Sequence, residues 1–169
     1  MTIIRCTAKL LKEFGMKSTN TADQLPGLCD WHANLLRLDR KKYVLFTNDQ
    51  TLYSFLVRWT KSLGLTSFQE RFRLGLLKSL VNDNLDEEQL EYLLRRHEQI
   101  TITKTNNRSV LGSMNDLVFQ IRYMIYMKGG LSEFDLPEIN RELNRIPMGA
   151  IQYIFSIEEL KRRLSDSCE

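Results

Sequence analysis

The chain has 169 residues, of which 43% are hydrophobic and 27% charged, and its net charge is +3 at pH 7. These values are typical of a soluble globular domain, and the small net charge excludes the strong basic excess that marks many nucleic-acid-binding proteins by composition alone. At this length one core holds a fold without metals or disulfides, so we expect a single globular domain over residues 1–169.

Cysteine usage and the start of the chain favour a cytoplasmic protein. The three cysteines are odd in number, have no Cys-x-x-Cys spacing and accompany only two histidines, which argues against a zinc site and for a reducing compartment. Residues 1–5 already include an arginine and lack the apolar run of a signal peptide. The most apolar segment, residues 110–127, is interrupted by polar and charged side chains and is too polar to span a membrane. We therefore expect no metal, no cofactor and no membrane contact.

Short runs of β-branched and aromatic residues predict five strands. They cover residues 3–6, 32–38, 42–47, 100–103 and 150–155. Only polar residues separate the second run from the third, which predicts a hairpin that turns at residues 39–41. Residues 31–38 also fit a helix, which is the alternative for that segment.

Apolar residues at helical spacing, with capping residues before them, predict seven helices. The first spans residues 7–14 and the second residues 51–63, where Leu52, Phe55, Leu56, Trp59 and Leu63 form one stripe. The other five open at the capping residues Ser67, Asp86, Ser109, Asp135 and Ser156, and the Ser109 cap precedes the long helix 110–128.

These elements together predict an α+β fold in which a small mixed or antiparallel sheet of about five strands is packed by helices. The predicted order is β-α-β-β-α-α-α-β-α-α-β-α, with a helical insertion at about residues 51–98. No internal repeat or long linker divides the chain.

A first polar cluster joins strand 100–103 to the long helix. Its candidate binding residues are Asn107, Arg108, Ser109, Gly112, Asn115 and Asp116. A helix N-terminus presents unpaired backbone N–H groups that suit an anion, and Arg108 adds a charged donor. Arg108 and Asn115 share one side of the helix, so we predict a shallow polar groove floored by Gly112. The structural alternative makes Ser109 an ordinary cap, Gly112 a packing notch and Asn115 a buried hydrogen-bond organiser.

A second polar cluster lies in the predicted hairpin and at its exit. Its candidate binding residues are Trp31, Asn34, Arg40, Lys41 and Asn48. A basic hairpin beside an exposed aromatic ring suits a phosphate backbone with base stacking, and Asn34 or Asn48 would form the wall opposite Gly112. The alternative makes Trp31 a core residue, Asn48 part of a turn, and Arg40 with Lys41 a solvated hairpin tip.

Three sequence blocks resemble the recurrent motifs of a prokaryotic family known only as a domain of unknown function. They are Trp31-x-Ala33-Asn34, then Arg40-Lys41-x-x-x-Leu45-Phe46-x-Asn48 followed by Thr51, and Asn107-Arg108-Ser109-Val110-Leu111-Gly112-Ser113-Met114-Asn115-Asp116. The start of the chain, Ile4-Arg5-Cys6-Thr7-x-Lys9-Leu10, is similar to the start of that family as well. The resemblance spans most of residues 3–127, implies no activity and assigns no role to the C-terminal part.

The usual catalytic templates are absent from the sequence. It contains no G-x-x-x-x-G-K-[ST], H-E-x-x-H, G-x-S-x-G or G-x-G-x-x-G, and its two histidines, His32 and His97, are far apart. The triplet Asp39-x-Lys41 is similar to part of a metal-dependent nuclease site, but it falls at a turn rather than within a strand.

Three functional hypotheses follow. The first is a non-catalytic binding or regulatory module for an anionic, nucleic-acid partner or for a protein, with a surface that joins the basic hairpin to the start of the long helix. The second is an enzyme acting on a phosphorylated or nucleic-acid substrate, with Arg108 and the backbone at residues 109–110 holding phosphate and Asp116 or Asp39 as metal ligand or base. The third is a homo-oligomer or one half of a two-component assembly, because Tyr126 and Met127 exceed what one buried helix face needs.

Overall fold

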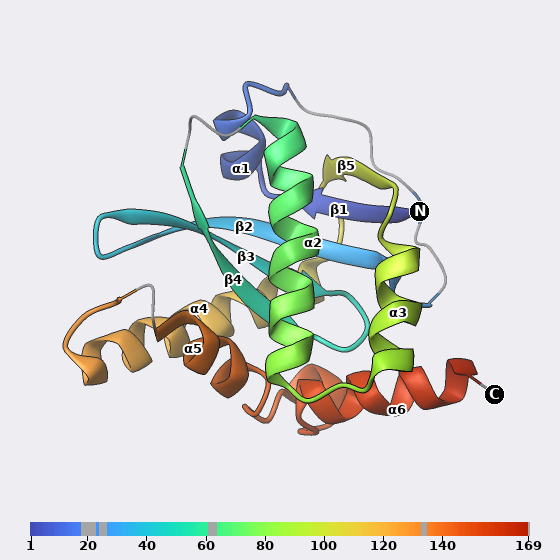
Figure 1. Ribbon diagram of the computed structural model, residues 1–169. Helices are drawn as coiled ribbons and strands as arrows, with labels where there is room; N and C mark the ends of the chain where they lie inside the picture. The colour runs from blue at the N-terminus through green and yellow to red at the C-terminus, as the bar shows by residue number, and fades with distance from the viewer. Residues whose placement is uncertain (18–22, 24–26, 61–63, 133–134, 169) are drawn as a thin grey trace.

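The structure is a computed structural model that describes residues 1–17, 23, 27–60, 64–132 and 135–168. A mixed five-stranded sheet in the order β4-β3-β2-β1-β5 lies at its centre (Figure 1). The strands are β1 (Thr2–Cys6), β2 (Asp30–Leu38), β3 (Lys41–Asn48), β4 (Ser54–Trp59) and β5 (Ile100–Lys104). Strand β1 runs parallel to β2 and β5, whereas β2, β3 and β4 are antiparallel neighbours. The expected α+β single domain with a small five-stranded sheet is confirmed.

In the described residues, six α-helices pack around this sheet. They are α1 (Ala8–Glu13), α2 (Leu65–Asn82), α3 (Glu87–Arg96), α4 (Arg108–Lys128), α5 (Leu136–Leu143) and α6 (Ser156–Cys168). Helix α2 crosses one face of the sheet, and α4 and α5 lie on the other (Figure 1). Helix α6 lies beneath α2 and α3 in that view and contributes to the core on the α2 side.

The sheet separates two hydrophobic cores because neighbouring residues of a strand point to opposite faces. In β2, Trp31, Ala33 and Leu35 belong to the core beneath α2, whereas Leu36 and Leu38 belong to the core beneath α4 and α5. Strands buried on both faces carry almost no polar positions. Most residues of β2, β3 and β4 are therefore apolar on both sides of the sheet.

Strands β2 and β3 form the predicted hairpin, so the alternative helix over residues 31–38 is wrong. Asp39 and Arg40 make the two-residue turn with φ values of 46° and 64°. Positive φ at both central residues gives the turn whose twist matches antiparallel strands. The Asp39 carboxylate also accepts a hydrogen bond of 2.6 Å from the backbone N–H of Leu131, just beyond the end of α4.

The predicted helix over residues 51–63 is wrong for its described part, because residues 54–59 form strand β4. Phe55, Val57 and Trp59 pack beneath α2, while Leu56 packs toward α4 and α5. Burial on both faces hides the period-two pattern, and the remaining apolar residues happen to fall at helical spacing. Leu52, with a φ of 57°, lies in a turn before β4. The helical insertion, which was expected to begin at about residue 51, therefore begins only at α2.

Three further local predictions are corrected. The expected strand 150–155 is a 3-10 turn, Gly149–Ile151, followed by two residues with positive φ, and its one β-bridge among the described residues joins Pro147 to Phe155. Helix α4 starts two residues earlier than expected, because Asn107 rather than Ser109 is its cap. Helix α2 starts at Leu65 with Gly64 as its cap, so Ser67 lies inside the helix.

Candidate functional site

Trp31 is a core residue rather than an exposed stacking platform. It is 1% exposed, and its ring makes edge-to-face contacts with Phe55 and Phe72. Its indole N–H donates to the Leu28 carbonyl at 3.2 Å. The expectation of an aromatic ring beside a basic hairpin for nucleic-acid bases is therefore wrong, because the period of β2 directs Trp31 beneath α2.

The two asparagines of the hairpin are used inside the protein. The side-chain NH₂ of the buried Asn48 donates to the carbonyls of Leu28 and Asp30, and its oxygen accepts hydrogen bonds from the turn that follows. The side-chain oxygen of Asn34 accepts a hydrogen bond of 3.1 Å from the Thr7 hydroxyl. Asn48 therefore organises a turn, as in the structural alternative, and neither asparagine forms the expected groove wall.

The predicted groove over Gly112 is also wrong. Arg108, Ser109, Gly112, Asn115 and Asp116 are exposed on α4, and nothing lies within 4 Å of the position that a Cβ at Gly112 would occupy. Gly112 therefore lies on the open outer face of the helix, and Asn115 is not a buried organiser either. Gly112, Asn115 and Asp116 thus form an open surface, whereas Arg108 and Ser109 border the cavity described below.

The backbone donors at the start of α4 are already engaged. The Asn107 side-chain oxygen accepts hydrogen bonds from the backbone N–H groups of Ser109 and Val110, at 3.0 and 3.2 Å. An anion bound there would have to displace this cap, which itself stabilises a helix by about 1 kcal/mol. The arrangement weakens the expected phosphate cradle at residues 109–110.

The basic hairpin turn of the second cluster and the start of α4 lie at opposite ends of that helix. Arg40 and Lys41 are exposed at the hairpin turn, whose Asp39 contacts Leu131 beyond the last turn of α4, whereas Arg108 begins the helix. A helix of 21 residues is about 30 Å long. The structure therefore does not join the basic hairpin turn to the start of α4, and Asp39 does not converge on Arg108.

A buried ionic cluster, which the sequence analysis missed, lies beside the start of α4. The Arg5 guanidinium is 2.7 Å from the Asp30 carboxylate and 3.7 Å from that of Asp49, and His32 Nδ1 is 2.6 Å from Asp49. Arg5 and Asp49 line a cavity of about 440 Å³ together with residues 106–109. The Arg5 charge is already matched by these two carboxylates, which weakens the case for an anion in this cavity. An arginine inside the apolar run 3–6 was the sequence signal for this cluster.

The Asp49–His32 pair is similar in form to a carboxylate that orients a catalytic base. His32 is completely buried, however, and is not among the residues that line the cavity. A general base has to reach its substrate directly or through one water. The pair is therefore an internal hydrogen bond that links β2 to the residue after β3.

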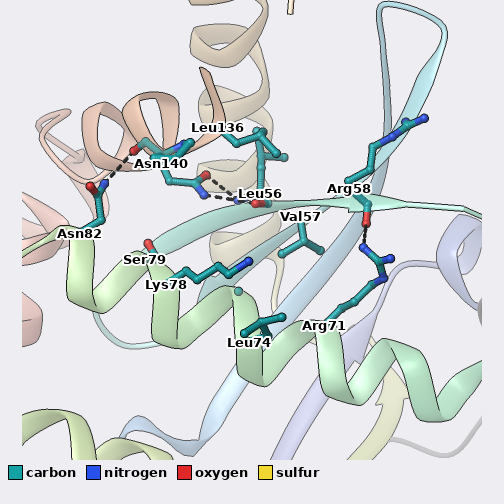
Figure 2. Close-up of a pocket in the computed structure, with 12 residues that line it drawn as sticks. Leu56, Val57, Arg58, Arg71, Leu74, Lys78, Ser79, Asn82, Leu136 and Asn140 are labelled. Atoms are coloured by element: carbon teal, nitrogen blue, oxygen red, sulfur yellow. Dashed lines mark hydrogen bonds between the residues drawn. The ribbon is translucent and has the colours of Figure 1, made fainter. Parts of the chain in front are cut away.

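A second cavity, of about 270 Å³, lies between β4, α2 and α5 (Figure 2). Val57 lies at its floor, Leu74 and Lys78 come from α2, and Leu136 comes from α5. Leu74 is 52% exposed, so the cavity opens to solvent along α2. We call it the β4 groove; the other residues that line it are Leu56, Arg58, Arg71, Gly75, Ser79, Asn82, Pro137 and Asn140.

The charged side chains of the β4 groove are all basic. Lys78 extends from α2 toward Val57, and Arg71 donates a 2.8 Å hydrogen bond to the Arg58 carbonyl (Figure 2). The Arg58 guanidinium points away from the groove and lies 5.3 Å from the centre of the Tyr43 ring. None of the twelve described residues that line the groove carries a carboxylate, an imidazole or a thiol.

Helix α5 is fixed against β4 by two asparagines one helical turn apart. Asn140 exchanges hydrogen bonds with the backbone N–H and C=O of Leu56, and Asn144 does the same with Ser54. The Asn82 side chain donates to the Pro137 carbonyl at 2.8 Å and links α2 to α5 at one end of the groove (Figure 2). The groove is thus held open by specific contacts rather than by loose packing.

The part of the chain that the structure describes contains no group of three or more His, Cys, Asp or Glu side chains placed to hold a metal ion. None of its helices is long and apolar enough to cross a membrane.

Comparison with known proteins places the chain in a family. A profile described as a domain of unknown function, DUF6933, matches residues 3–159. The chain belongs to this family. The DUF6933 match extends beyond the three sequence blocks of the resemblance and covers β1 from its second residue, the other four strands, the β4 groove and α4. No curated protein and no solved structure matches the chain.

Proposed function

We propose that this protein is a non-catalytic binding module that takes an acidic, partly apolar segment of a partner protein into the β4 groove. One observation carries the proposal: the groove combines an apolar floor with Lys78 and Arg71 and has no carboxylate among its described lining residues. A few charged groups placed around apolar side chains are typical of a ligand site.

The apolar part of the ligand has a defined place. Val57 at the floor, Leu74 on the α2 side and Leu136 on the α5 side surround it, and the volume of about 270 Å³ suits one or two side chains. Burying one aliphatic side chain there contributes about 1.5–3 kcal/mol. The groove therefore favours a partner segment anchored by one aliphatic residue.

The acidic part of the ligand is expected at Lys78. This side chain is exposed and extends along the groove, so its ammonium group is available to a carboxylate beside the anchor (Figure 2). Arg71 is half-buried and has one nitrogen on the Arg58 carbonyl, so its other donors complete the basic end. Complementary charge would set the orientation and rate of binding more than its strength.

A protein segment is favoured over a nucleic acid on the same geometry. Nucleic-acid affinity comes from many phosphate contacts along a basic track, whereas this groove offers two cations beside an apolar floor. The exposed Arg40 and Lys41 lie at the hairpin turn and do not extend the groove. A reducing, cytoplasmic setting fits Cys6 and Cys29, which are free and buried.

The proposal is tested by selecting a random peptide library on the immobilised full chain. We expect enrichment of peptides that place Asp or Glu next to Leu, Ile or Met, and we expect the Lys78→Glu variant to lose them. Lys9→Glu, which reverses an exposed lysine on α1, is the matched control and should retain them.

Three outcomes contradict the proposal. They are enrichment of peptides without acidic residues, equal binding of acidic peptides to Lys78→Glu, and no enrichment at all. A single-stranded oligonucleotide that competes with the selected peptides at Lys78 would assign the groove to nucleic acid instead.

A further inference from the structure

The cavity of about 440 Å³ beside the start of α4 has a different character from the β4 groove. We call it the α4 cavity; the described residues that line it are all polar or charged, namely Arg5, Asp49, Asn106, Asn107, Arg108 and Ser109. None of them lines the β4 groove. The volume lies in the range of small-molecule sites. A ligand that fits this cavity is therefore small and polar.

Asp49 presents a buried carboxylate with one oxygen still available. Its side chain is 3% exposed and lines the α4 cavity. One of its oxygens lies 2.6 Å from His32 Nδ1. The other has no hydrogen-bond partner among the described residues, because Arg5 Nη1 is 3.7 Å away from it, which is beyond hydrogen-bond distance. A buried acceptor without a donor is costly, so an N–H group of a ligand would stabilise it.

The charges around Asp49 leave the buried end of the α4 cavity negative. Arg5 pairs with Asp30 at 2.7 Å and also faces Asp49, so one guanidinium stands against two carboxylates. With His32 counted as neutral, this buried group carries one negative charge in excess. The buried end of the cavity therefore favours a cationic donor such as an ammonium group.

The exposed end of the α4 cavity carries the opposite charge. Arg108 is exposed, lines the cavity and has no ion-pair partner in the part of the chain that the structure describes. Its guanidinium is well suited to a carboxylate, which it can bind through two parallel hydrogen bonds. The Asn107 cap already engages the backbone N–H groups of Ser109 and Val110, so the Arg108 side chain rather than the helix end would hold an anionic group.

From this separation of charge we infer that the α4 cavity binds a free amino acid with a small or polar side chain, with its ammonium group on Asp49 and its carboxylate on Arg108. A simple anion would face the excess negative charge at the buried end, and a simple cation would face Arg108. A zwitterion matches both ends. Asn106 and Ser109 supply hydrogen-bonding groups for a polar side chain of the ligand.

Thermal unfolding of the full chain in the presence of each common amino acid tests this site. We expect serine, asparagine or glutamine to raise the melting temperature by about 3–6 °C at about ten times its dissociation constant. Leucine and phenylalanine should raise it less, because the described lining offers no apolar side chain. The Lys78→Glu variant should respond to amino acids as the wild-type protein does, so this site and the β4 groove can fail independently.

The Arg108→Glu variant tests how the ligand is oriented. It reverses the charge at the exposed end, so calorimetry should show that the dissociation constant of the best-bound amino acid rises by about tenfold or more. The same variant should bind the matching amine without a carboxylate, which is ethanolamine in the case of serine, more tightly than the wild-type protein does. Arg122→Glu, an exposed charge reversal further along α4, is the matched control and should change neither value. Circular dichroism should show unchanged folding for both variants.

Three results overturn the inference. The first is that no amino acid raises the melting temperature, and the second is that Arg108→Glu binds the amino acid as tightly as the wild-type protein. The third is that the matching acid without an amino group, 3-hydroxypropionate in the case of serine, binds as tightly as the amino acid, which would make the α4 cavity an anion site.

Discussion

The side-chain amide of Asn140 makes with Leu56 the two hydrogen bonds that a neighbouring β-strand would make. The Leu56 N–H donates to the Asn140 side-chain oxygen at 2.7 Å, and the Asn140 NH₂ donates to the Leu56 carbonyl at 3.2 Å. Edge strands expose unpaired backbone groups that attract other chains. Helix α5 therefore covers the open edge of β4 and at the same time forms one wall of the β4 groove.

Replacing Asn140 with leucine should destabilise the protein by about 2–4 kcal/mol, because it leaves the N–H and C=O of Leu56 buried without partners. Asn140→Asp retains the acceptor but loses the donor, so we expect a smaller loss. Urea unfolding followed by circular dichroism measures both values. Asn115→Leu on the exposed face of α4 is the matched control and should change the free energy of unfolding by no more than about 0.5 kcal/mol. Equal changes in the free energy of unfolding for Asn140→Leu and Asn115→Leu would show that the hydrogen bonds between Asn140 and Leu56 do not stabilise the protein.

Gly75 and Gly112 lie inside helices and should respond to alanine in opposite directions. A Cβ at Gly75 would overlap Val57 Cγ1 and lie 2.9 Å from Phe55, so Gly75→Ala should cost about 1–3 kcal/mol through overpacking. Nothing lies within 4 Å of a Cβ at Gly112, so Gly112→Ala should stabilise the chain by up to about 1 kcal/mol. Thermal unfolding followed by circular dichroism measures both. A lower melting temperature for Gly112→Ala would contradict the open helix face.

His97 should make the stability of the protein depend on pH. Burial, with the positive charges of the N-terminus, Arg96 and Arg73, lowers the pKa of His97 to about 3, while an unfolded chain has a histidine pKa of about 6.5. Between these values the unfolded chain binds one proton more than the folded one, so the free energy of unfolding falls as pH falls.

From pH 7 to pH 5 this histidine should account for a loss of about 2 kcal/mol. In His97→Gln, which keeps a polar partner for the Thr2 hydroxyl, the loss over that range should be smaller by this amount. Urea unfolding of both proteins at the two pH values measures the difference. If the free energies of unfolding of the two proteins fall in parallel with pH, the pKa of His97 is the same in the folded and the unfolded chain, which would contradict the lowered pKa.

The sequence predicts most of this fold where turn and capping residues mark the ends of an element. The capping box of α3, Asp86 with Gln89, forms as expected, and the hairpin turns where its polar residues indicate. Strand β4 escapes prediction because helices cover both of its faces, so its apolar residues follow no period-two pattern. The type of such a segment depends on packing between distant elements rather than on local sequence.

The candidate site was harder to predict than the fold because its residues are scattered along the chain. Val57, Lys78 and Leu136 come from three elements, and no short motif joins them. Of the motif residues, Asn107 instead caps α4, and Arg108, Ser109, Gly112, Asn115 and Asp116 lie exposed on it. Two local signals do point to the groove: a glycine inside α2 that allows close packing on β4, and the pair Asn140 and Asn144 one turn apart on α5.

Methyl NMR of the full chain during titration with a short peptide of alternating Glu and Leu tests the groove most directly. We predict saturable shifts of the Val57, Leu74 and Leu136 methyl signals that disappear in Lys78→Glu and persist in Lys9→Glu. Shifts confined to Val110 at the start of α4, or shifts at the groove that Lys78→Glu leaves unchanged, would contradict the proposed binding site.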